Sequence, residues 1–447
     1  MSSIQLSDHF TYRKLLLFVL PSIGVMIFTS IYGVVDGYCV SQFVGKTAFS
    51  AVNLVMPFPM LMGAFGFMLG TGGSAIVSKT MGEGDLPRAG KYFSMLVFSG
   101  IVLGLLLTLL GEAILPGVVT LMKADEAMRP YCILYGRILL AGIPFFMLQY
   151  MFQSFMVTAE KPTLGFVITL ASGLTNILLD IVLVGVLRLG VAAAAAATVA
   201  SQVVGGLIPL LYFIAGNSSP LRLRFTRLEP RILGKACANG CSELLTNISM
   251  SLVNILYNYQ LMAIAGADGV AAYGVIMYVC FIFIAVFVGY VVGSAPIVGY
   301  HYGAGNHSEL QNMVKKSLIL ISISGIVMTA LGILCAAPLS ELYVGYDEAL
   351  CAMTTRGFRL YSLSFLIVGF NIFGSAFFTA LGNGLISGII SFLRTLVFQI
   401  IAILVLPQIF GLDGIWCAVI AAEGAAILVT AGFLVANRRK YHYGRST

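Results

Sequence analysis

Long apolar runs recur along the whole 447-residue chain and restrict its fold more than any other feature of the sequence. Apolar residues make up 59% of the chain, charged residues only 10%, and the mean hydropathy is +0.98. Charged residues make up about a quarter of a typical soluble protein, so this composition indicates an integral membrane protein. The runs are continuous rather than alternating every second residue, which favours membrane helices over an outer-membrane barrel.

The apolar runs predict twelve membrane-crossing helices. A helix needs about 20 apolar residues to cross the bilayer, and the chain accommodates on the order of a dozen such helices without a separate soluble catalytic domain. The predicted spans are residues 15–41, 50–78, 93–115, 131–157, 163–187, 190–214, 236–262, 270–298, 315–338, 355–380, 384–407 and 412–436. The predicted fold class is therefore an all-α polytopic membrane protein.

Basic residues lie in short clusters between the apolar runs. If the first residue lies in the cytoplasm, eighteen of the 25 Lys and Arg residues fall on the cytoplasmic side, with Arg394 among them near the end of a span. The positive-inside rule therefore predicts a multi-pass protein of the cell membrane with both termini in the cytoplasm. The same clusters account for the formal net charge of +7, so this charge does not indicate a nucleic-acid partner.

The two halves of the chain align with each other at one constant offset of 221 residues. The aligned pairs include Gly45 with Gly266, Gly82 with Gly303, Gly136 with Gly357, Ser154 with Ser375 and Gly190 with Gly411. Because each repeat holds six spans, an even number, the halves share one orientation and are related by a pseudo-twofold axis along the membrane normal. We therefore predict a six-helix N-terminal lobe over residues 1–216, a cytoplasmic linker over 217–235 and a six-helix C-terminal lobe over 236–447.

Two equivalent bundles that face each other leave a cleft between them. Such an arrangement favours alternating access by rocking of one bundle against the other, as in secondary transporters. A repeat that merely duplicates a stable bundle is the alternative. Met and Phe side chains in the predicted second span, such as Met56 and Phe65, are suited to a promiscuous substrate cavity, although core and lipid-facing positions explain them equally well.

Four acidic residues lie well within predicted spans, where a charge costs about 2.5–3.5 kcal/mol and so marks a functional candidate. They are Asp36, Asp180, Glu243 and Glu423. At a rise of about 1.5 Å per residue, Asp36 in the first span and Asp180 in the fifth reach the same depth, in the outer half of the membrane. Asn176 precedes Asp180 by four residues and shares its helix face, and Thr198 on the sixth span also reaches the outer half.

These four side chains of the N-terminal lobe can hold a cation. Two carboxylates, an amide and a hydroxyl supply the oxygen ligands that a small hard cation such as Na⁺ prefers. The carboxylate pair can instead hold a proton, because repulsion and desolvation oppose the ionisation of both acids. The sequence thus predicts a cation-coupling site, with Na⁺ as its metal if a metal is bound. A polar cluster that only fastens helices together is the alternative.

The C-terminal lobe lacks this combination of residues. The offset of 221 pairs Asp36 with Tyr257, and Asp180 with Ile401. Glu243 lies nearer the cytoplasmic side, where we expect it to take part in coupling or to attract a cationic substrate. Glu423 lies near the middle of the last span, where a hydrogen bond between helices explains it equally well.

Five short segments carry a resemblance to a known family. They are VVDGYCVSQFVG at 34–45, GEGD at 82–85, NILLD at 176–180, AAAAAATVASQ at 192–202 and GYHYGAGN at 299–306. The chain resembles the multidrug and toxic compound extrusion (MATE) family of the MOP superfamily, in the branch with Asp in the first span and Asn-x-x-x-Asp in the fifth. The resemblance implies a twelve-helix, two-lobe antiporter that exports amphipathic, often cationic, organic compounds in exchange for protons or sodium ions.

The resemblance also implies roles for individual residues. It assigns cation coupling to Asp36, Asn176, Asp180 and Thr198, with Tyr135 of the fourth span as a companion. Some family members carry an acid in the tenth span, whereas here residues 355–380 contain none, and Asn371 is their only amide. Glu243 is then the remaining candidate in the second lobe. The expected partners are small organic substrates and membrane lipid, acting on a monomer that needs no cofactor beyond the coupling ion.

Two other functions remain open at this stage. A flippase for a lipid-linked anionic substrate, a function found in the same superfamily, would be expected to line its cleft with Arg or Lys. The nearest such residues, Arg137, Arg359 and Arg394, all lie near predicted span ends. A membrane-embedded enzyme is disfavoured because the sequence contains neither His-Glu-x-x-His nor Gly-x-Ser-x-Gly, and no predicted span contains a histidine.

Overall fold

The computed structural model describes residues 4–44, 46–122 and 124–444, and within these ranges the side chains of residues 34, 36–42, 46 and 49 lie outside the description. The first helices are α1 (Tyr12–Val44), α2 (Lys46–Val55), α3 (Pro57–Gly82), α4 (Leu86–Leu121), α5 (Arg129–Ala141), α6 (Ile143–Thr158), α7 (Pro162–Leu179), the π-helical segment η1 (Asp180–Val186) and α8 (Val191–Ile214). The remaining helices are α9 (Pro230–Gly303), α10 (His307–Val344), α11 (Glu348–Ser362), α12 (Phe365–Ala380), α13 (Gly384–Phe392), the π-helical segment η2 (Leu393–Val397), α14 (Phe398–Phe410) and α15 (Leu412–Asn437). The described ranges contain no strand.

Nine helices of the described part are long and apolar enough to cross a membrane, or up to eleven if each bent helix pair counts as one span. The bent pairs are α5 with α6, at 54°, and α11 with α12, at 47°. Pro144 in the first turn of α6 explains the first bend, because proline lacks an N–H and clashes with the preceding turn. The predicted second span, 50–78, is likewise interrupted at Met56, between α2 and α3.

Helix α9 covers two predicted spans. Its 74 residues would extend about 110 Å as one straight helix, far more than the roughly 30 Å of a bilayer core. The chain turns at Gly266, where φ is 62° and ψ is −151°, a backbone conformation that glycine adopts without a steric penalty. The rings of Tyr257 and Tyr273, one on each side of the turn, stack with centroids 4.9 Å apart, so the two arms lie side by side. Within the predicted linker 217–235, residues up to Glu229 are not helical and α9 begins at Pro230.

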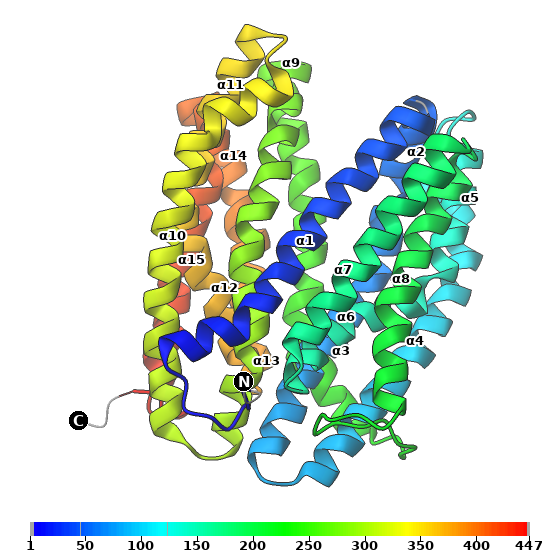
Figure 1. Ribbon diagram of the computed structural model, residues 1–447. Helices are drawn as coiled ribbons and strands as arrows, with labels where there is room; N and C mark the ends of the chain where they lie inside the picture. Colours follow the sequence, from blue (N-terminus) through cyan, green and yellow to red (C-terminus); the bar gives the residue numbers. More distant parts are fainter. Residues whose placement is uncertain (1–3, 45, 123, 445–447) are drawn as a thin grey trace.

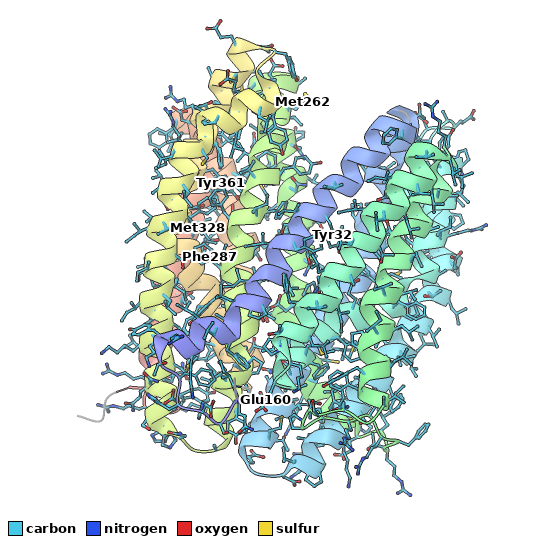
Figure 2. All side chains as sticks on the ribbon, in the orientation of Figure 1. Tyr32, Glu160, Met262, Phe287, Met328 and Tyr361 are labelled. Carbon is cyan, nitrogen blue, oxygen red and sulfur yellow. The ribbon has the colours of Figure 1, made fainter. Side chains whose placement is uncertain are left out.

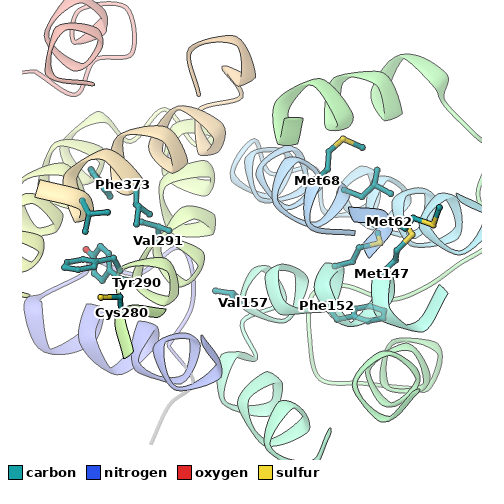
Figure 3. Close-up of a cluster of buried hydrophobic side chains, with 14 of the residues drawn as sticks. Met62, Met68, Met147, Phe152, Val157, Cys280, Tyr290, Val291 and Phe373 are labelled. Carbon is teal, nitrogen blue, oxygen red and sulfur yellow. The ribbon is translucent and has the colours of Figure 1, made fainter. Parts of the chain in front are cut away.

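Figure 1 shows two groups of helices that meet at one end and diverge toward the other. We call α1 to α8 the first group, of which α1 runs toward the other helices, and α9 to α15 the second group. Each group has its own buried apolar side chains: Figure 3 shows Met62, Met147 and Phe152 in the first group, and Tyr290 and Phe373 in the second. The end where the groups meet also holds residues 4–11, residues 215–229 and residues 438–444, and we call it the terminal end; the other is the far end.

At the terminal end the two groups touch backbone to backbone through glycine. A Cβ added to Gly240 of α9 would overlap the carbonyl oxygen of Met68, and one added to Gly72 of α3 would overlap the carbonyl oxygen of Ala236. Nearer the far end, by contrast, Gly66 of α3 packs against α6 of its own group. Gly72 and Gly240 therefore allow close contact between the groups at the terminal end.

The N-terminal segment, residues 4–11, also connects the two groups at the terminal end. The N–H of Leu6 donates to Oε1 of Glu160, in the α6–α7 loop, over 2.8 Å (Figure 2). The N–H of Phe10 donates to Oε1 of Glu309 on α10 over 3.0 Å, and Nδ1 of His9 lies 2.6 Å from the other oxygen of that carboxyl. Burial raises the pKa of Glu160 above its ordinary value, and the Leu6 N–H opposes this in part.

Candidate cation site

Helix α7 carries a stripe of buried polar residues. Thr169, Ser172, Asn176 and Asp180 follow one another at intervals of three or four residues, so they share one helix face, and all four are buried. At Asp180 the helix widens into the π-helical segment η1. Such segments are rare and occur frequently at functional sites.

The three helices that carry the predicted cation-site residues are neighbours. Helix α7 packs against α1 and α8, and η1 contacts both. The contact with α1 is close, because a Cβ added to Gly173 would overlap the ring of Phe28 and lie 2.9 Å from the ring of Tyr32, which Figure 2 labels on α1. Asp36 lies one turn beyond Tyr32 on the same helix, and its side chain lies outside the described residues.

The amide of Asn176 is buried next to Asp180 on the polar stripe. Its residue is 1% exposed, and among the described residues neither Nδ2 nor Oδ1 has a hydrogen-bond partner. An unsatisfied buried polar group costs about 1–3 kcal/mol, so an ion or a water that bonds to this amide is favoured. Thr198 on α8 is half-buried, and its hydroxyl donates to the carbonyl of Ala194 over 3.1 Å, which leaves its oxygen lone pairs available to accept or coordinate.

A hydrogen-bonded chain that the sequence analysis missed extends this stripe toward the terminal end. Nε2 of Gln149 on α6 donates to Oγ of Ser172 over 3.3 Å, and that hydroxyl donates to the carbonyl of Ser201 on α8 over 2.6 Å. The chain therefore ties α6, α7 and α8 together next to Asn176. The sequence could have predicted that Ser172 belongs to this cluster. Ser172 precedes Asn176 by four residues, the same spacing that places Asn176 and Asp180 on one helix face.

Tyr135 and the substrate-cavity candidates of the second span lie in the first group. Tyr135 is fully buried on α5, and its hydroxyl lies 3.9 Å from the sulfur of Met56, in the break between α2 and α3. The structure therefore brings Tyr135 and Met56 together. Phe65 is half-buried on α3 and packs against the apolar core.

Glu243 lies beside the contact between the two groups. It is half-buried on α9, three residues beyond Gly240, the glycine that meets Met68. Its backbone carbonyl accepts a hydrogen bond from Nδ2 of Asn247 over 2.8 Å, and its carboxyl interacts electrostatically with Arg394.

The assignment of Arg394 to a span end is wrong. Its span runs from Gly384 to Phe410, and ten residues from Gly384 place Arg394 about 15 Å along the helix axis. Nε of Arg394 donates to Oε1 of Glu423 over 2.8 Å, and the two side chains are only 13% and 4% exposed. A hydropathy pattern cannot detect this pairing, because the partner that compensates the charge lies on another helix.

Asn371 takes part in the same buried network. Its Nδ2 donates to Oε2 of Glu423 over 2.7 Å, and Oγ1 of Thr430 donates to its Oδ1 over 2.8 Å. Asn371 is fully buried on α12, and its described contacts join α12 to α15.

Comparison with known proteins settles the family. The model of the family described as MatE matches residues 21–182 and 244–405, more than half of the chain in two segments. The chain belongs to the MatE family. The first MatE segment contains Asp36, Asn176 and Asp180, and the second contains Asn371 and Arg394.

Named relatives and solved structures extend over nearly the whole MatE chain. The multidrug export protein MepA of Staphylococcus haemolyticus is 24% identical over 430 residues, which cover 96% of this chain and 94% of the relative. MepA of Staphylococcus aureus strain MRSA252 is 23% identical over 93% of this chain and 92% of its own length. A crystal structure of MATE in complex with MaL6 covers 99% of this chain and 100% of its own with a TM-score of 0.93, at 21% identity, and so has the same fold. These relatives are transport proteins and not enzymes, and the chain is a membrane protein.

Proposed function

We propose that this MatE protein is a secondary active multidrug efflux transporter. It exports amphipathic, often cationic, organic compounds in exchange for protons or sodium ions. The observation that carries the proposal is the buried stripe of Asn176 and Asp180 on α7, at the place where α1 and α8 meet that helix. Polar and ionisable groups at membrane depth are costly and mark ion pathways. The names of the relatives, multidrug export proteins, agree with this function.

The proposed architecture has twelve spans in two six-helix lobes, residues 1–216 and 236–447, related by a pseudo-twofold axis. The turn of α9 at Gly266 and the two bent pairs support this number of spans. The clusters of basic residues favour a cytoplasmic terminal end in the cell membrane. The contact between the groups at that end then corresponds to an outward-facing arrangement, and the protein alternates by rocking as a monomer surrounded by lipid.

Coupling requires that the ion binds the two arrangements with different affinities. Asp36, Asn176, Asp180 and Thr198 supply the oxygen atoms for Na⁺, or the two carboxylates hold a proton. Because α1 touches the second group near the terminal end and α7 further along, a change in the packing of α1 on α7 would be transmitted to the contact between the groups. The transporter needs no cofactor beyond this ion.

The decisive test is efflux of a fluorescent organic cation from proteoliposomes, with sodium and proton gradients imposed separately. We expect one of the two gradients to drive efflux. A purified protein that moves no organic compound under either gradient, but chemically converts a substrate, would contradict the proposal.

Replacing single neutral ligands distinguishes sodium from protons. A sodium site loses a ligand in Asn176→Ala and in Thr198→Ala, so we expect the half-saturating sodium concentration to rise about tenfold, the equivalent of about 1.4 kcal/mol per lost ligand. Thr175→Ala is the matched control, because that hydroxyl is exposed on the same helix and bonds only to Ala171 among the described residues. If both test variants transport normally while Asp180→Asn is inactive, the coupling ion is a proton.

Replacing Glu243 affects the substrate rather than the coupling ion. Glu243→Gln removes a half-buried negative charge beside the contact between the groups, so we expect cationic substrates to bind several-fold more weakly. Neutral substrates serve as the control and should bind as they do to the wild type. Equal weakening for cationic and neutral substrates would show that the carboxylate acts through packing and not through its charge.

The alternative function, a flippase for a lipid-linked anionic substrate, requires an available positive charge inside the membrane. Arg394 is such a charge by position, but its pairing with Glu423 neutralises it. The structure therefore gives this alternative no additional support.

A further inference from the structure

The second helix group contains a buried ion pair that the proposed transport cycle does not use. Nε of Arg394, in η2, donates to Oε1 of Glu423 on α15 over 2.8 Å. Nδ2 of Asn371 donates to the other carboxylate oxygen over 2.7 Å and to the backbone carbonyl of Glu423 over 3.0 Å. Both oxygens of the carboxylate are thus bonded, one by a cation and the other by an amide.

Other titratable groups on two helices, α9 and α11, interact with this pair. Glu243 of α9 interacts electrostatically with Arg394. Tyr257 of α9 and Tyr361 of α11 interact electrostatically with Glu423. Because a phenol is neutral at physiological pH, the positive charge that balances Glu423 here is that of Arg394.

The polar cluster of the first group contains acidic residues but no basic residue to neutralise them. The spans that hold its polar cluster, residues 15–41, 163–187 and 190–214, contain two acids and neither Lys nor Arg. In the fifth span of each half, a π-helical segment carries the ionisable residue, and that residue is Asp180 in η1 but Arg394 in η2. The predicted spans of Asp36 and Asp180, residues 15–41 and 163–187, therefore contain no basic residue, whereas Glu423 in the second group has Arg394 in direct contact.

We infer that the guanidinium of Arg394 permanently occupies a cation site at Glu423. Without this guanidinium, an exchanged monovalent cation would bind at the same place. Removing the guanidinium charge would then create a new cation site at Glu423, with Asn371 and its partner Thr430 supplying further oxygen atoms. In the wild type, the charge of the second group stays constant through the cycle, so cations are exchanged in the first group alone. The comparison with an exchanged cation rests on the proposed function, but the site at Glu423 can be tested without transport.

The test measures thermal unfolding of the purified full-length protein in nanodiscs. NaCl is compared with choline chloride at equal ionic strength, over a series of pH values. Asp36→Asn combined with Asp180→Asn provides the background, because it removes the ion response of the first group. If this background still responds to Na⁺ or pH as the wild type does, the proposed coupling site is wrong, and this outcome is separate from the result at Arg394.

In this background, Arg394→Gln is expected to gain stability from a bound cation. If the cation is Na⁺, the unfolding temperature should be clearly higher in NaCl than in choline chloride. If it is a proton, the unfolding temperature should be clearly higher at low pH than at high pH. The response should disappear when Glu423→Gln is added, because no carboxylate then remains to bind the cation. Arg394→Lys, which keeps a positive charge, should show no new response.

Three results would overturn the inference. The first is an Arg394→Gln protein whose unfolding temperature gains no dependence on Na⁺ or pH. The second is a gained dependence that persists after Glu423→Gln. The third is an Arg394→Gln protein that does not fold at any sodium concentration or pH, because an exchanged cation then cannot take the place of the guanidinium.

Discussion

Asp36→Asn and Asp180→Asn are each expected to reduce ion-driven export of an organic cation to the background rate of empty liposomes. Asparagine has nearly the shape of aspartate but can neither release a proton nor neutralise a bound Na⁺. Membrane insertion and thermal stability should remain close to wild type, because the substitution removes a charge that is costly at this depth. Efflux from proteoliposomes and thermal unfolding of the same preparations measure the two effects.

Asp268→Asn is the matched control for these variants. Asp268 is exposed near the Gly266 turn of α9, so the same chemical change there should leave efflux unchanged. Wild-type efflux by a folded Asp36→Asn and a folded Asp180→Asn protein would show that coupling does not use this pair of acids.

Gly240→Ala is expected to shift the protein away from the arrangement in which the two groups touch at the terminal end. The new methyl group would overlap the carbonyl oxygen of Met68, and overpacking of this kind costs about 1–3 kcal/mol. If the other arrangement lacks this contact, its population relative to the present one rises about 5- to 150-fold. Leu121 is the last residue of α4 and Tyr346 follows the end of α10, and both side chains are exposed. Spin labels at these two positions would report the shift as a shorter distance between the groups.

Gly274→Ala controls for a methyl group added elsewhere on the same helix. An added Cβ at Gly274 has no neighbour within 4 Å, so the distance distribution should stay as in the wild type. Substrate efflux by Gly240→Ala should fall, because a transporter held in one arrangement completes few cycles. An unchanged distance distribution in Gly240→Ala would show that the glycine contact does not decide between the arrangements.

Much of the helical pattern could be predicted from the sequence, because an apolar run of this length forms a helix in lipid whatever its neighbours are. The turn of α9 illustrates this: Gly266 separates two predicted spans, and the structure bends there. Interruptions within a run were missed at Met56 and at the α11–α12 bend. A break inside an apolar run changes neither composition nor charge, so hydropathy carries little information about it.

The candidate site could be predicted where its residues share one helix, and not where they meet across helices. Asn176 and Asp180 are four residues apart, and a fixed helical period places them on one face. Arg394 and Glu423 lie on different helices, so their contact depends on how those helices pack, which no local pattern encodes. The error at Arg394 followed from placing its charge near the cytoplasmic end of its predicted span.

The N-terminal segment makes unequal contacts with the two helix groups. This difference bears on which group the segment would follow if the groups separate. Among the described hydrogen bonds, one, from Leu6 to Glu160, connects it to the first group outside α1, the helix that directly follows the segment. Contacts with Glu309, Asn312 and Lys316 connect it to the second group. If the groups separate at the terminal end, as proposed, we expect the segment to stay with α10, to which it makes more of the described hydrogen bonds than to the α6–α7 loop.

Such a separation would expose Glu160 to water, and the exposure would have a chemical consequence. Burial raises the pKa of this carboxyl, so the attached state favours the protonated form and weakens as pH rises through the raised pKa. On exposure the pKa returns toward its ordinary value. In the proposed cycle, at a pH between these two values, we therefore expect opening of the terminal end to release a proton on that side and closure to take one up.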